Sequence, residues 1–414
     1  MIGQSGTVGA QSHPVAPHTP GTGGRLRVAV IAACPFPYPR GTPARILRSA
    51  EALADRGHDV QVVTYHLGDH DMATRLRIHR TPPVSTYRRL APGPSYQKLL
   101  LVDPLLVWRL ATVLRRTPFD VIHAHHFEAL LVALAASGAR RRIPIVFDAH
   151  TMLGSELHYY GLGMTKGWKQ RIGTVLDRVL PRTADAVIAV SDNIHASIVR
   201  SLGDKIPVEL IANGVEYEHF AIDGETARPG CLIYTGNLSG YQRIDLMLAG
   251  FRRVLDRRPD VRLQIVLNEP TGPLVSMIAE HGVGDAVTAV QAGFDELPRL
   301  LARAPIALNP RTECDGLPQK LLNYMASGRA IVSSAGSARH LRHEDTALIV
   351  PNDDVEAFAA SVLTLLDRPD YARRLGDAAR RQARTEFSWP SVAMRMEALY
   401  HRAIAAREQR HAAA

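Results

Sequence analysis

The sequence is poor in cysteine, and it has no long apolar run and no glycine-rich dinucleotide fingerprint. Its three cysteines, Cys34, Cys231 and Cys314, lie far apart without a Cys-x-x-Cys pair, so neither a disulfide framework nor a zinc site is indicated. No apolar stretch is long enough to span a bilayer. The absence of Gly-x-Gly-x-x-Gly disfavours a dinucleotide oxidoreductase. We therefore expect a cytoplasmic protein, in a reducing compartment.

Charge is missing from the start of the chain. Residues 1–24 contain no Lys, Arg, Asp or Glu and no apolar core segment, which argues against a secretory signal. Gly, Pro, Ser and Thr dominate this stretch, so we predict a disordered tail. The 414-residue chain is long enough for two or three domains, and its 46% hydrophobic content is ample for packed cores.

The charged residues that are present are mostly basic. A net charge of +9 and an isoelectric point near 9.7 favour anionic partners, such as phosphorylated ligands, a membrane surface or nucleic acid. The arginines are scattered rather than clustered, and no nucleic-acid-binding motif occurs. We therefore do not expect nucleic acid to be a partner.

From Arg25 onward, short β-branched runs alternate with helical patterns. "LRVAVIAA" predicts a buried strand, "PARILRSAEALADRG" a helix that ends at Gly57, and "HDVQVVTY" the next strand. A second series of such units starts at Cys231, after the polar linker "AIDGETARPG". This alternation predicts parallel sheets and an α/β fold, with two Rossmann-like domains facing across a cleft. The predicted divisions are a tail at 1–24, an N-terminal domain at 25–215, a linker at 216–229, a C-terminal domain at 230–385, and a helix and tail at 386–414 that cross back to the N-terminal domain.

The stretch "DGLPQKLLNYMASGRAIV" joins a loop to a predicted helix and a strand. Pro318 suits the first turn of the helix, where its missing N–H costs nothing. The backbone N–H groups of Gly316 and Leu317, the helix dipole and Lys320 together predict a diphosphate site. Asn323, about one turn further on, would reach a ribose diol. The alternative is a capped core helix without a ligand.

Four segments in this order resemble a known enzyme family. They are "PFPYPRGTPARILRSAEALADRGHDVQVVT", "ANGVE", "YTGNLSGYQRIDLML" and "GLPQKLLNYMASGRAIV". Their order and spacing are similar to those of the retaining nucleotide-sugar glycosyltransferases of glycosyltransferase family 4, which have the GT-B fold. The resemblance covers nearly everything from Arg25 to about Ala405. It implies that the N-terminal domain binds the acceptor and the C-terminal domain binds the nucleotide-sugar donor.

The sequence departs from the family pattern at two places. The pattern has two glutamates eight positions apart, the second of which binds the ribose hydroxyls, and this chain has Asp315 and Asn323 there. The pattern also has Arg and Lys near the diphosphate, where this chain has Asn237 and Gln242. We interpret the chain as a variant subgroup in which a neutral amide, a weaker hydrogen-bond acceptor than a carboxylate, replaces the second glutamate.

Two nearby arginines could supply the missing positive charge. Arg243 directly follows the "YQ" of the second-domain motif, and Arg311 ends the strand-like segment "IALNPR". A guanidinium suits bidentate contact with phosphate, so both are predicted donor ligands. The alternative for Arg243 is a solvated helix residue.

In the predicted N-terminal domain, a loop and a histidine are further candidates for contact with the donor. Gly41 and Thr42 lie where the first predicted strand turns into its helix, and they predict a loop that covers the donor phosphates. An ordinary strand-to-helix turn is the alternative. "FDAHTML" places Asp148 and His150 at a strand end, and the family has a His in this neighbourhood that faces the donor sugar.

Two patterns imitate metal sites. His123 and His125 share one face of a predicted strand end, but no carboxylate or Cys at ligand spacing completes the set. Asp69 and Asp71 imitate the Asp-x-Asp motif of metal-dependent transferases, yet they lie in a polar loop. We predict that the protein needs no metal and no other cofactor.

The segment from Tyr96 to Arg116 has two interpretations. It is apolar on one side, carries a Trp and has basic flanks, with Arg88 and Arg89 shortly before it. Such a segment could lie in a membrane interface and meet a lipid-linked acceptor. The alternative is a domain helix with one face in the core.

These features predict a hexosyltransferase that moves a hexose from a nucleoside-diphosphate sugar to a hydroxyl acceptor, either a carbohydrate or a lipid-linked one. The resemblance implies retention of configuration, catalytic roles for Lys320, Asp315 and His150, and work on cell-envelope polysaccharide or glycolipid. The protein would act in the cytoplasm, with peripheral contact at the inner face of the membrane as a further expectation. Two alternatives are a catalytically silent GT-B binding subunit and a nucleotide-sugar epimerase.

Overall fold

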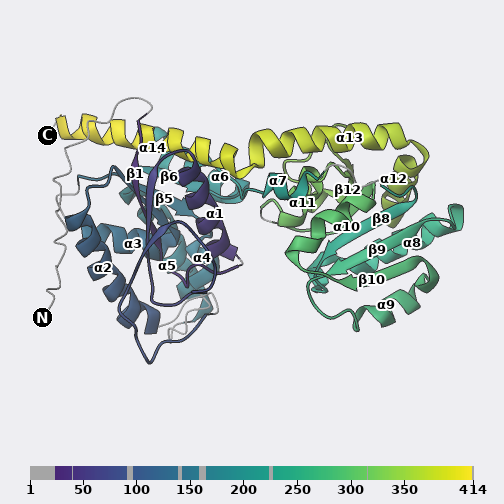
Figure 1. Ribbon diagram of the computed structural model, residues 1–414, viewed down its shortest axis with the longest axis horizontal. Coiled ribbons are helices and arrows are strands. Elements are labelled where there is room, and N and C mark those ends of the chain that lie inside the picture. Colours follow the sequence, from purple (N-terminus) through teal and green to yellow (C-terminus); the bar gives the residue numbers. More distant parts are fainter. Residues whose placement is uncertain are drawn as a thin grey trace, which may run out of the picture.

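A computed structural model of the protein describes residues 24–39, 41–90, 97–138, 142–157, 165–222, 227–314 and 316–412. Two predictions lie outside these residues: nearly all of the tail at 1–24, and the site residue Asp315. Each of the two domains is built on a parallel sheet, as the alternation of strands and helices predicts (Figure 1).

The N-terminal sheet has seven strands in the order β3-β2-β1-β4-β5-β6-β7, and all of its strand pairs are parallel. Each pair is linked by a crossover, so all the carboxyl ends lie at one edge of the sheet. The strands are β1 (Arg27–Ala32), β2 (Asp59–Thr64), β3 (Arg77–Arg80), β4 (Val121–His125), β5 (Ile145–Ala149), β6 (Ala186–Ala189) and β7 (Val208–Leu210).

Helices cover both faces of this sheet, because successive residues of its strands point to opposite sides. Val28 and Val30 of β1 pack in one core with α1 and α14, whereas Ala29 and Ile31 pack in another with α2, α3 and α6. A short π-helical turn (Lys98–Val102) leads into α2. The helices are α1 (Gly41–Asp55), α2 (Asp103–Arg116), α3 (His126–Ser137), α4 (Leu153–Glu156), α5 (Lys166–Val179), α6 (Asp192–Leu202) and α14 (Trp389–Ala412).

The C-terminal sheet has six parallel strands in the order β10-β9-β8-β11-β12-β13. Its strands are β8 (Cys231–Gly236), β9 (Arg262–Leu267), β10 (Val287–Gln291), β11 (Ile306–Asn309), β12 (Ala330–Ser334) and β13 (Leu348–Val350). Its helices are α8 (Ile244–Arg257), α9 (Leu274–Glu280), α10 (Leu297–Arg303), α11 (Gln319–Ala326), α12 (Val355–Asp367) and α13 (Pro369–Gln382).

Two connections join the domains. The linker contains the short helix α7 (Tyr217–Phe220), whose Phe220 packs into the core of the C-terminal domain. After α13 the chain returns, and α14 runs along the N-terminal domain, as predicted (Figure 1). Within the described ranges, none of the helices combines the length and the apolar character that crossing a bilayer requires.

Candidate active site

A cavity of about 340 Å³ lies between the two domains, within the size range of small-molecule sites. Loops that follow β5, β6 and β7 form one wall, and the loop before α11 forms the other. Its lining comprises His150, Thr151, Met152, Ser155, Val190, Ser191, Asn193, Ile194, Asn213, Gly316 and Leu317. The predicted cleft is therefore present, and it brings the predicted residues His150, Gly316 and Leu317 to one space.

Lys320 lies in the first turn of α11. Its Nζ donates a hydrogen bond of 2.6 Å to Oε1 of Gln242 and lies 4.4 Å from the ring centroid of Tyr234. Burial, followed by the positive charge of Arg311, lowers the pKa of Lys320 from its ordinary value to about 7. In the free protein the ammonium form of Lys320 is therefore less favourable than in water, and a bound anion would stabilise it.

Asn323 lies one turn further along the same helix and is buried. Its Oδ1 has no hydrogen-bond partner among the described residues, and an unsatisfied buried polar atom costs about 1–3 kcal/mol. A hydroxyl group of a ligand would remove that cost. The helix begins at Gln319, so Pro318 occupies the position before the helix rather than its first turn.

Arg311 lies close enough to the amino group of Lys320 to affect its pKa. Its guanidinium carbon is 4.6 Å from the ring centroid of Tyr241, and its Nε donates to the carbonyl oxygen of Glu313 at 2.5 Å. The stack on the ring orients the guanidinium, and the pKa of Lys320 responds to its charge. Arg311 and Lys320 therefore form a pair of cations at the carboxyl ends of β8 and β11.

Arg243 and Asn237 already have partners. Arg243, which has a left-handed φ of 53°, forms ion pairs with the carboxylates of Asp245 and Asp353. Oδ1 of Asn237 accepts the backbone N–H of Ser239, which shapes the loop after β8. Both residues remain predicted donor ligands, but a phosphate would have to compete with two carboxylates for Arg243.

His150 lines the N-terminal side of the cavity, whereas the loop predicted at Gly41 and Thr42 is instead the first turn of α1. Helix α1 begins at Gly41, whose φ of +61° is a conformation that glycine adopts without strain. Thr42 Oγ1 lies 3.4 Å from Nδ1 of His150, and His150 Nε2 lies 3.2 Å from Nδ1 of His125. Burial lowers the pKa of His150, so its imidazole is neutral at pH 7.

An ion pair beneath the histidines orders this edge of the sheet. Nε of Arg45 donates to the buried carboxylate of Asp148 at 3.2 Å, and its NH1 donates to Ala212 O and to Asn213 Oδ1. Burial alone would raise the pKa of Asp148, but the charge of Arg45 holds it well below the usual range. Arg45 thereby connects the cavity residue Asn213 to the carboxylate that contacts His125.

The expectation that no carboxylate accompanies the two histidines is wrong. Strands β4 and β5 pair in parallel with His125 opposite Asp148, which brings ligand atoms of His123, His125 and Asp148 within 4.8 Å of one another. Arg45 already neutralises that carboxylate, and Nδ1 of His123 lies 2.7 Å from the hydroxyl of Tyr400. A metal ion would have to compete with Arg45 for that carboxylate, so the absence of a metal stays our prediction.

Sequence reasoning missed three residues that shape the site. Arg45 had a signal, because it is the one charged residue among the buried residues of α1, one turn after Thr42. Tyr234 had the weaker signal of a polar tip near the end of a buried strand. Tyr400 had no local signal, because its partner His123 is 277 positions away in the chain.

Comparisons with known proteins agree with this architecture. Residues 40–214 match a family model described as a glycosyl transferase 4-like domain, and residues 229–368 match one described as glycosyl transferases group 1. An MMP α-(1→4)-mannosyltransferase of Mycolicibacterium hassiacum is 28% identical over 413 residues, covering 92% of this chain and 99% of that protein. A phosphatidyl-myo-inositol mannosyltransferase of Mycolicibacterium smegmatis is 25% identical over 395 residues, covering 91% and 93%.

Among solved structures, a sucrose-phosphate synthase from Thermosynechococcus elongatus is similar with a TM-score of 0.69 at 20% identity, covering 92% of this chain and 100% of that one. Two facing Rossmann-like domains with a returning C-terminal helix define the GT-B class of proteins. Within that class the chain is a glycosyltransferase, with a 4-like domain at its N-terminal side and a group 1 domain at its C-terminal side. The predicted fold and enzyme class are confirmed.

Proposed function

We propose that this glycosyltransferase moves a hexose from a nucleoside-diphosphate sugar to a hydroxyl acceptor, with retention of configuration. One observation carries the proposal: the first two turns of α11 hold both a half-buried amine with a pKa of about 7 and a buried amide oxygen without a partner among the described residues. A diphosphate would stabilise the ammonium form of Lys320. A ribose hydroxyl would donate to Oδ1 of Asn323.

The leaving group determines what the site has to supply. A nucleoside diphosphate departs readily once its growing negative charge is stabilised, so preorganised cations matter more than a proton donor. Lys320 and Arg311 are those cations, and the amino end of α11 with the N–H groups of Gly316 and Leu317 adds to them. Arg243 would bind the diphosphate only after its ion pairs with Asp245 and Asp353 break.

The bond changes proceed on one face of the sugar. The bond from C1 to the phosphate oxygen breaks, the acceptor oxygen bonds to C1 from the same side, and the acceptor proton passes to the departing phosphate oxygen. This step balances without a protein base and without a metal. Asp315, which lies outside the described residues, keeps its proposed catalytic role.

The hexose would occupy the cavity between His150 and Gly316. The neutral imidazole of His150 adds no charge to this space, and a sugar hydroxyl would bind it by replacing Thr42 at Nδ1, while Nε2 stays next to His125. The cavity has walls from both domains, and their closure on the donor would exclude water and limit its hydrolysis. We place the acceptor, a carbohydrate or a lipid-linked hydroxyl, on the N-terminal side of this cavity.

The names of the relatives support two finer choices within this proposal. Both are called mannosyltransferases, which favours a mannosyl donor, and one name contains a phosphatidyl lipid, which favours a lipid-linked acceptor. We propose that the enzyme works in the cytoplasm at the inner face of the membrane, in the synthesis of envelope polysaccharide or glycolipid.

A donor screen tests the proposal. Purified protein is incubated with UDP- and GDP-hexoses and candidate acceptors, and the new anomeric bond is assigned by NMR. Lys320→Ala should lower kcat/KM by about 10²-fold or more, because it removes a cation from the developing charge. Lys205→Ala, at an exposed position of the N-terminal domain, is the matched control and should leave turnover unchanged. Unchanged turnover in Lys320→Ala, an inverted product, or no affinity of the wild type for any sugar nucleotide would contradict the proposal.

A further inference from the structure

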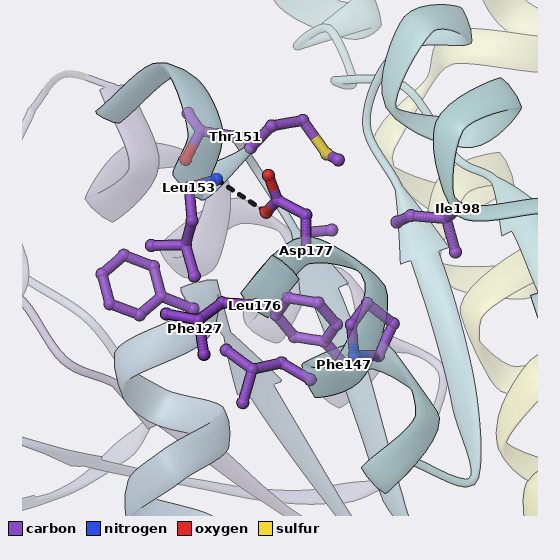
Figure 2. A pocket seen from close by; sticks show the side chains of 11 residues that line it. Phe127, Phe147, Thr151, Leu153, Leu176, Asp177 and Ile198 are labelled. Atoms are coloured by element: carbon purple, nitrogen blue, oxygen red, sulfur yellow. Dashed lines mark hydrogen bonds between the residues drawn. The ribbon is translucent and has the colours of Figure 1, made fainter. Parts of the chain in front are cut away.

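Exposed large hydrophobic side chains gather on one layer of the N-terminal domain. Helices α2, α3 and α6 share a core against one face of the sheet. Leu176 of α5 lines one crevice with Phe127 of α3 and Ile198 of α6, so α5 belongs to the same layer (Figure 2). This layer lies on the side of the sheet opposite α14 (Figure 1). The exposed apolar side chains of this layer and the segments leading into it are Leu90, Leu99, Leu100, Leu101, Trp108, Leu131, Trp168, Val175, Val179 and Val199.

The rest of the described chain exposes few such side chains. On the C-terminal domain they are Tyr241, Val275 and Phe294, which lie on separate elements, and α14 adds Met394. Single exposed hydrophobics are ordinary, but a soluble protein rarely gathers them on one surface without a binding role. The concentration of exposed hydrophobic side chains on one layer therefore indicates a binding surface.

Helices α2 and α5 of this layer each carry a stripe of apolar and basic side chains at helical spacing. On α5, Trp168, Arg171, Val175 and Arg178 recur every three or four residues and are all exposed. Along the turn before α2 and α2 itself, Leu101, Pro104, Trp108 and Arg115 are exposed at intervals of three, four and seven residues, which also keep to one face of a helix. Tryptophan and arginine side chains both suit the boundary between lipid tails and headgroups.

Three acidic side chains of α2, α3 and α5 already have hydrogen-bond or ion-pair partners within the protein. They therefore do not cancel the positive charge of the arginines that α2 and α5 expose. Glu128 pairs with Lys98 at 2.6 Å, and Asp103 accepts from the hydroxyl of Tyr65. Asp177 of α5 accepts the backbone N–H of Leu153 (Figure 2) and also that of Gly154. An anionic partner is therefore complementary to the layer.

The same contacts place the layer at the mouth of the active site. Glu128 lies in the first turn of α3, directly after the carboxyl end of β4, so its partner Lys98 brings Leu99–Leu101 to that edge. The α4 segment that α5 packs against supplies Ser155 to the cavity wall. Gly173 makes this packing possible, since a Cβ there would lie 2.5 Å from the carbonyl oxygen of Leu153.

We propose that this face, represented by Leu100, Leu101, Trp108, Trp168, Arg171 and Val175 and here called the α2/α5 surface, binds the headgroup and upper acyl region of an anionic lipid bilayer. Docking by this surface would hold the cavity next to the membrane, so a lipid-linked hydroxyl could enter while its chains stay in the bilayer. This last consequence rests on the proposed function; the docking itself does not, because it needs no nucleotide.

Tryptophan fluorescence offers a direct test, because two of the three tryptophans lie on the α2/α5 surface and Trp389 is buried. The full-length protein, without nucleotide, is mixed with vesicles of phosphatidylcholine alone or with about one-third phosphatidylglycerol. We expect sedimentation with the anionic vesicles, a blue shift of the emission and protection from iodide quenching. Raising the salt concentration should weaken binding.

Variants assign the binding to this surface. The double variant Trp108→Ser with Trp168→Ser, and the charge reversals Arg115→Glu with Arg171→Glu, should each lower vesicle affinity by about tenfold or more. The matched control, Val275→Ser with Met394→Ser, replaces equally exposed side chains elsewhere and should bind as the wild type does. Nucleotide affinity, measured by calorimetry, should stay unchanged in all of them, which separates this proposal from the proposed transferase activity.

Two results would overturn the docking proposal. The first is wild-type protein that stays in the supernatant with every vesicle composition. The second is a wild-type dimer that the tryptophan double variant converts to a monomer while vesicle binding is absent, because the surface would then be an interface between copies of this chain.

Discussion

The amino group of Lys320 titrates close to neutral pH, because burial and the nearby Arg311 charge lower its pKa to about 7. A diphosphate binds the ammonium form. Above pH 7 the free protein loses that proton, so the apparent affinity for nucleoside diphosphate should fall, approaching tenfold per pH unit between pH 8 and 9. Calorimetry across pH 7–9 measures the slope, and binding near pH 8 should take up a proton from the buffer.

Lys320→Arg is the control for this pH dependence. A guanidinium stays protonated throughout the range, so the variant should bind with an affinity that hardly changes between pH 7 and 9. If the variant and the wild type show the same slope, another group is responsible and the role assigned to Lys320 is wrong.

The candidate site shows which contacts a sequence pattern can predict. Gly316, Leu317 and His150 meet at one cavity because the carboxyl edges of the two parallel sheets face each other, which the prediction of two Rossmann-like domains across a cleft already implied. Arg45 and Asp148 were not foreseen as a pair, because their contact depends on the strand order, in which β5 lies next to β4. Periodicity predicts which side of a helix is buried but not what it is buried against.

The loop that joins β11 to α11 depends on one glycine in the neighbouring turn. Gly336 follows β12, and a Cβ at this position would lie 1.7 Å from the carbonyl oxygen of Thr312. The same turn accepts the N–H of Cys314, and Asn352 holds both segments through Gly336 N and Thr312 O. This packing fixes the segment that carries Arg311.

Gly336→Ala should therefore displace this loop and misplace the cations around the diphosphate. We expect kcat/KM to fall by about 10- to 100-fold, with a stability loss of about 1–3 kcal/mol from overpacking. Gly240→Ala is the matched control, since its Cβ would meet nothing within 4 Å and its φ is not positive. Steady-state kinetics and urea unfolding measure both variants, and equal activity of the two would show that the loop tolerates the shift.

The order of the strands and helices was predictable, but several boundaries were not. Helix α8 begins only at Ile244, because Arg243 adopts a left-handed φ that interrupts the helical backbone. Of the segment from Tyr96 to Arg116, the described residues 97–116 contain a π-helical turn followed by α2. Leu106 and Leu110 are buried, as expected of a domain helix with one face in the core, while Trp108 is exposed. Its contact with a membrane remains a proposal. Such details depend on local backbone strain and tertiary packing rather than on periodicity.

Helix α14 makes the N-terminal domain depend on the last part of the chain. Its buried side chains cover the face of the sheet that α1 leaves open, and Met396 and Tyr400 pack among Val28, Val30 and Ile46. Ion pairs near both ends of α14 attach it to the N-terminal domain. Arg395 contacts Glu209, and Arg407 contacts the buried Asp185. A domain made from residues 25–215 alone would therefore expose an apolar face.

Two methionines on α14 test this dependence with matched chemistry. Met396 is fully buried against the N-terminal sheet, whereas Met394, two positions earlier, is 51% exposed. Met396→Ala should lower the free energy of unfolding of the N-terminal domain by about 2–5 kcal/mol, because the side chain leaves a cavity. Met394→Ala should change it by less than about 0.5 kcal/mol. Urea unfolding followed by tryptophan fluorescence reports the transition, since Trp389 lies in the same core and Trp108 and Trp168 lie on helices of the same domain. Equal stability of the two variants would mean that α14 rests on the domain without completing its core, and the N-terminal domain should then fold when cut off after Val215.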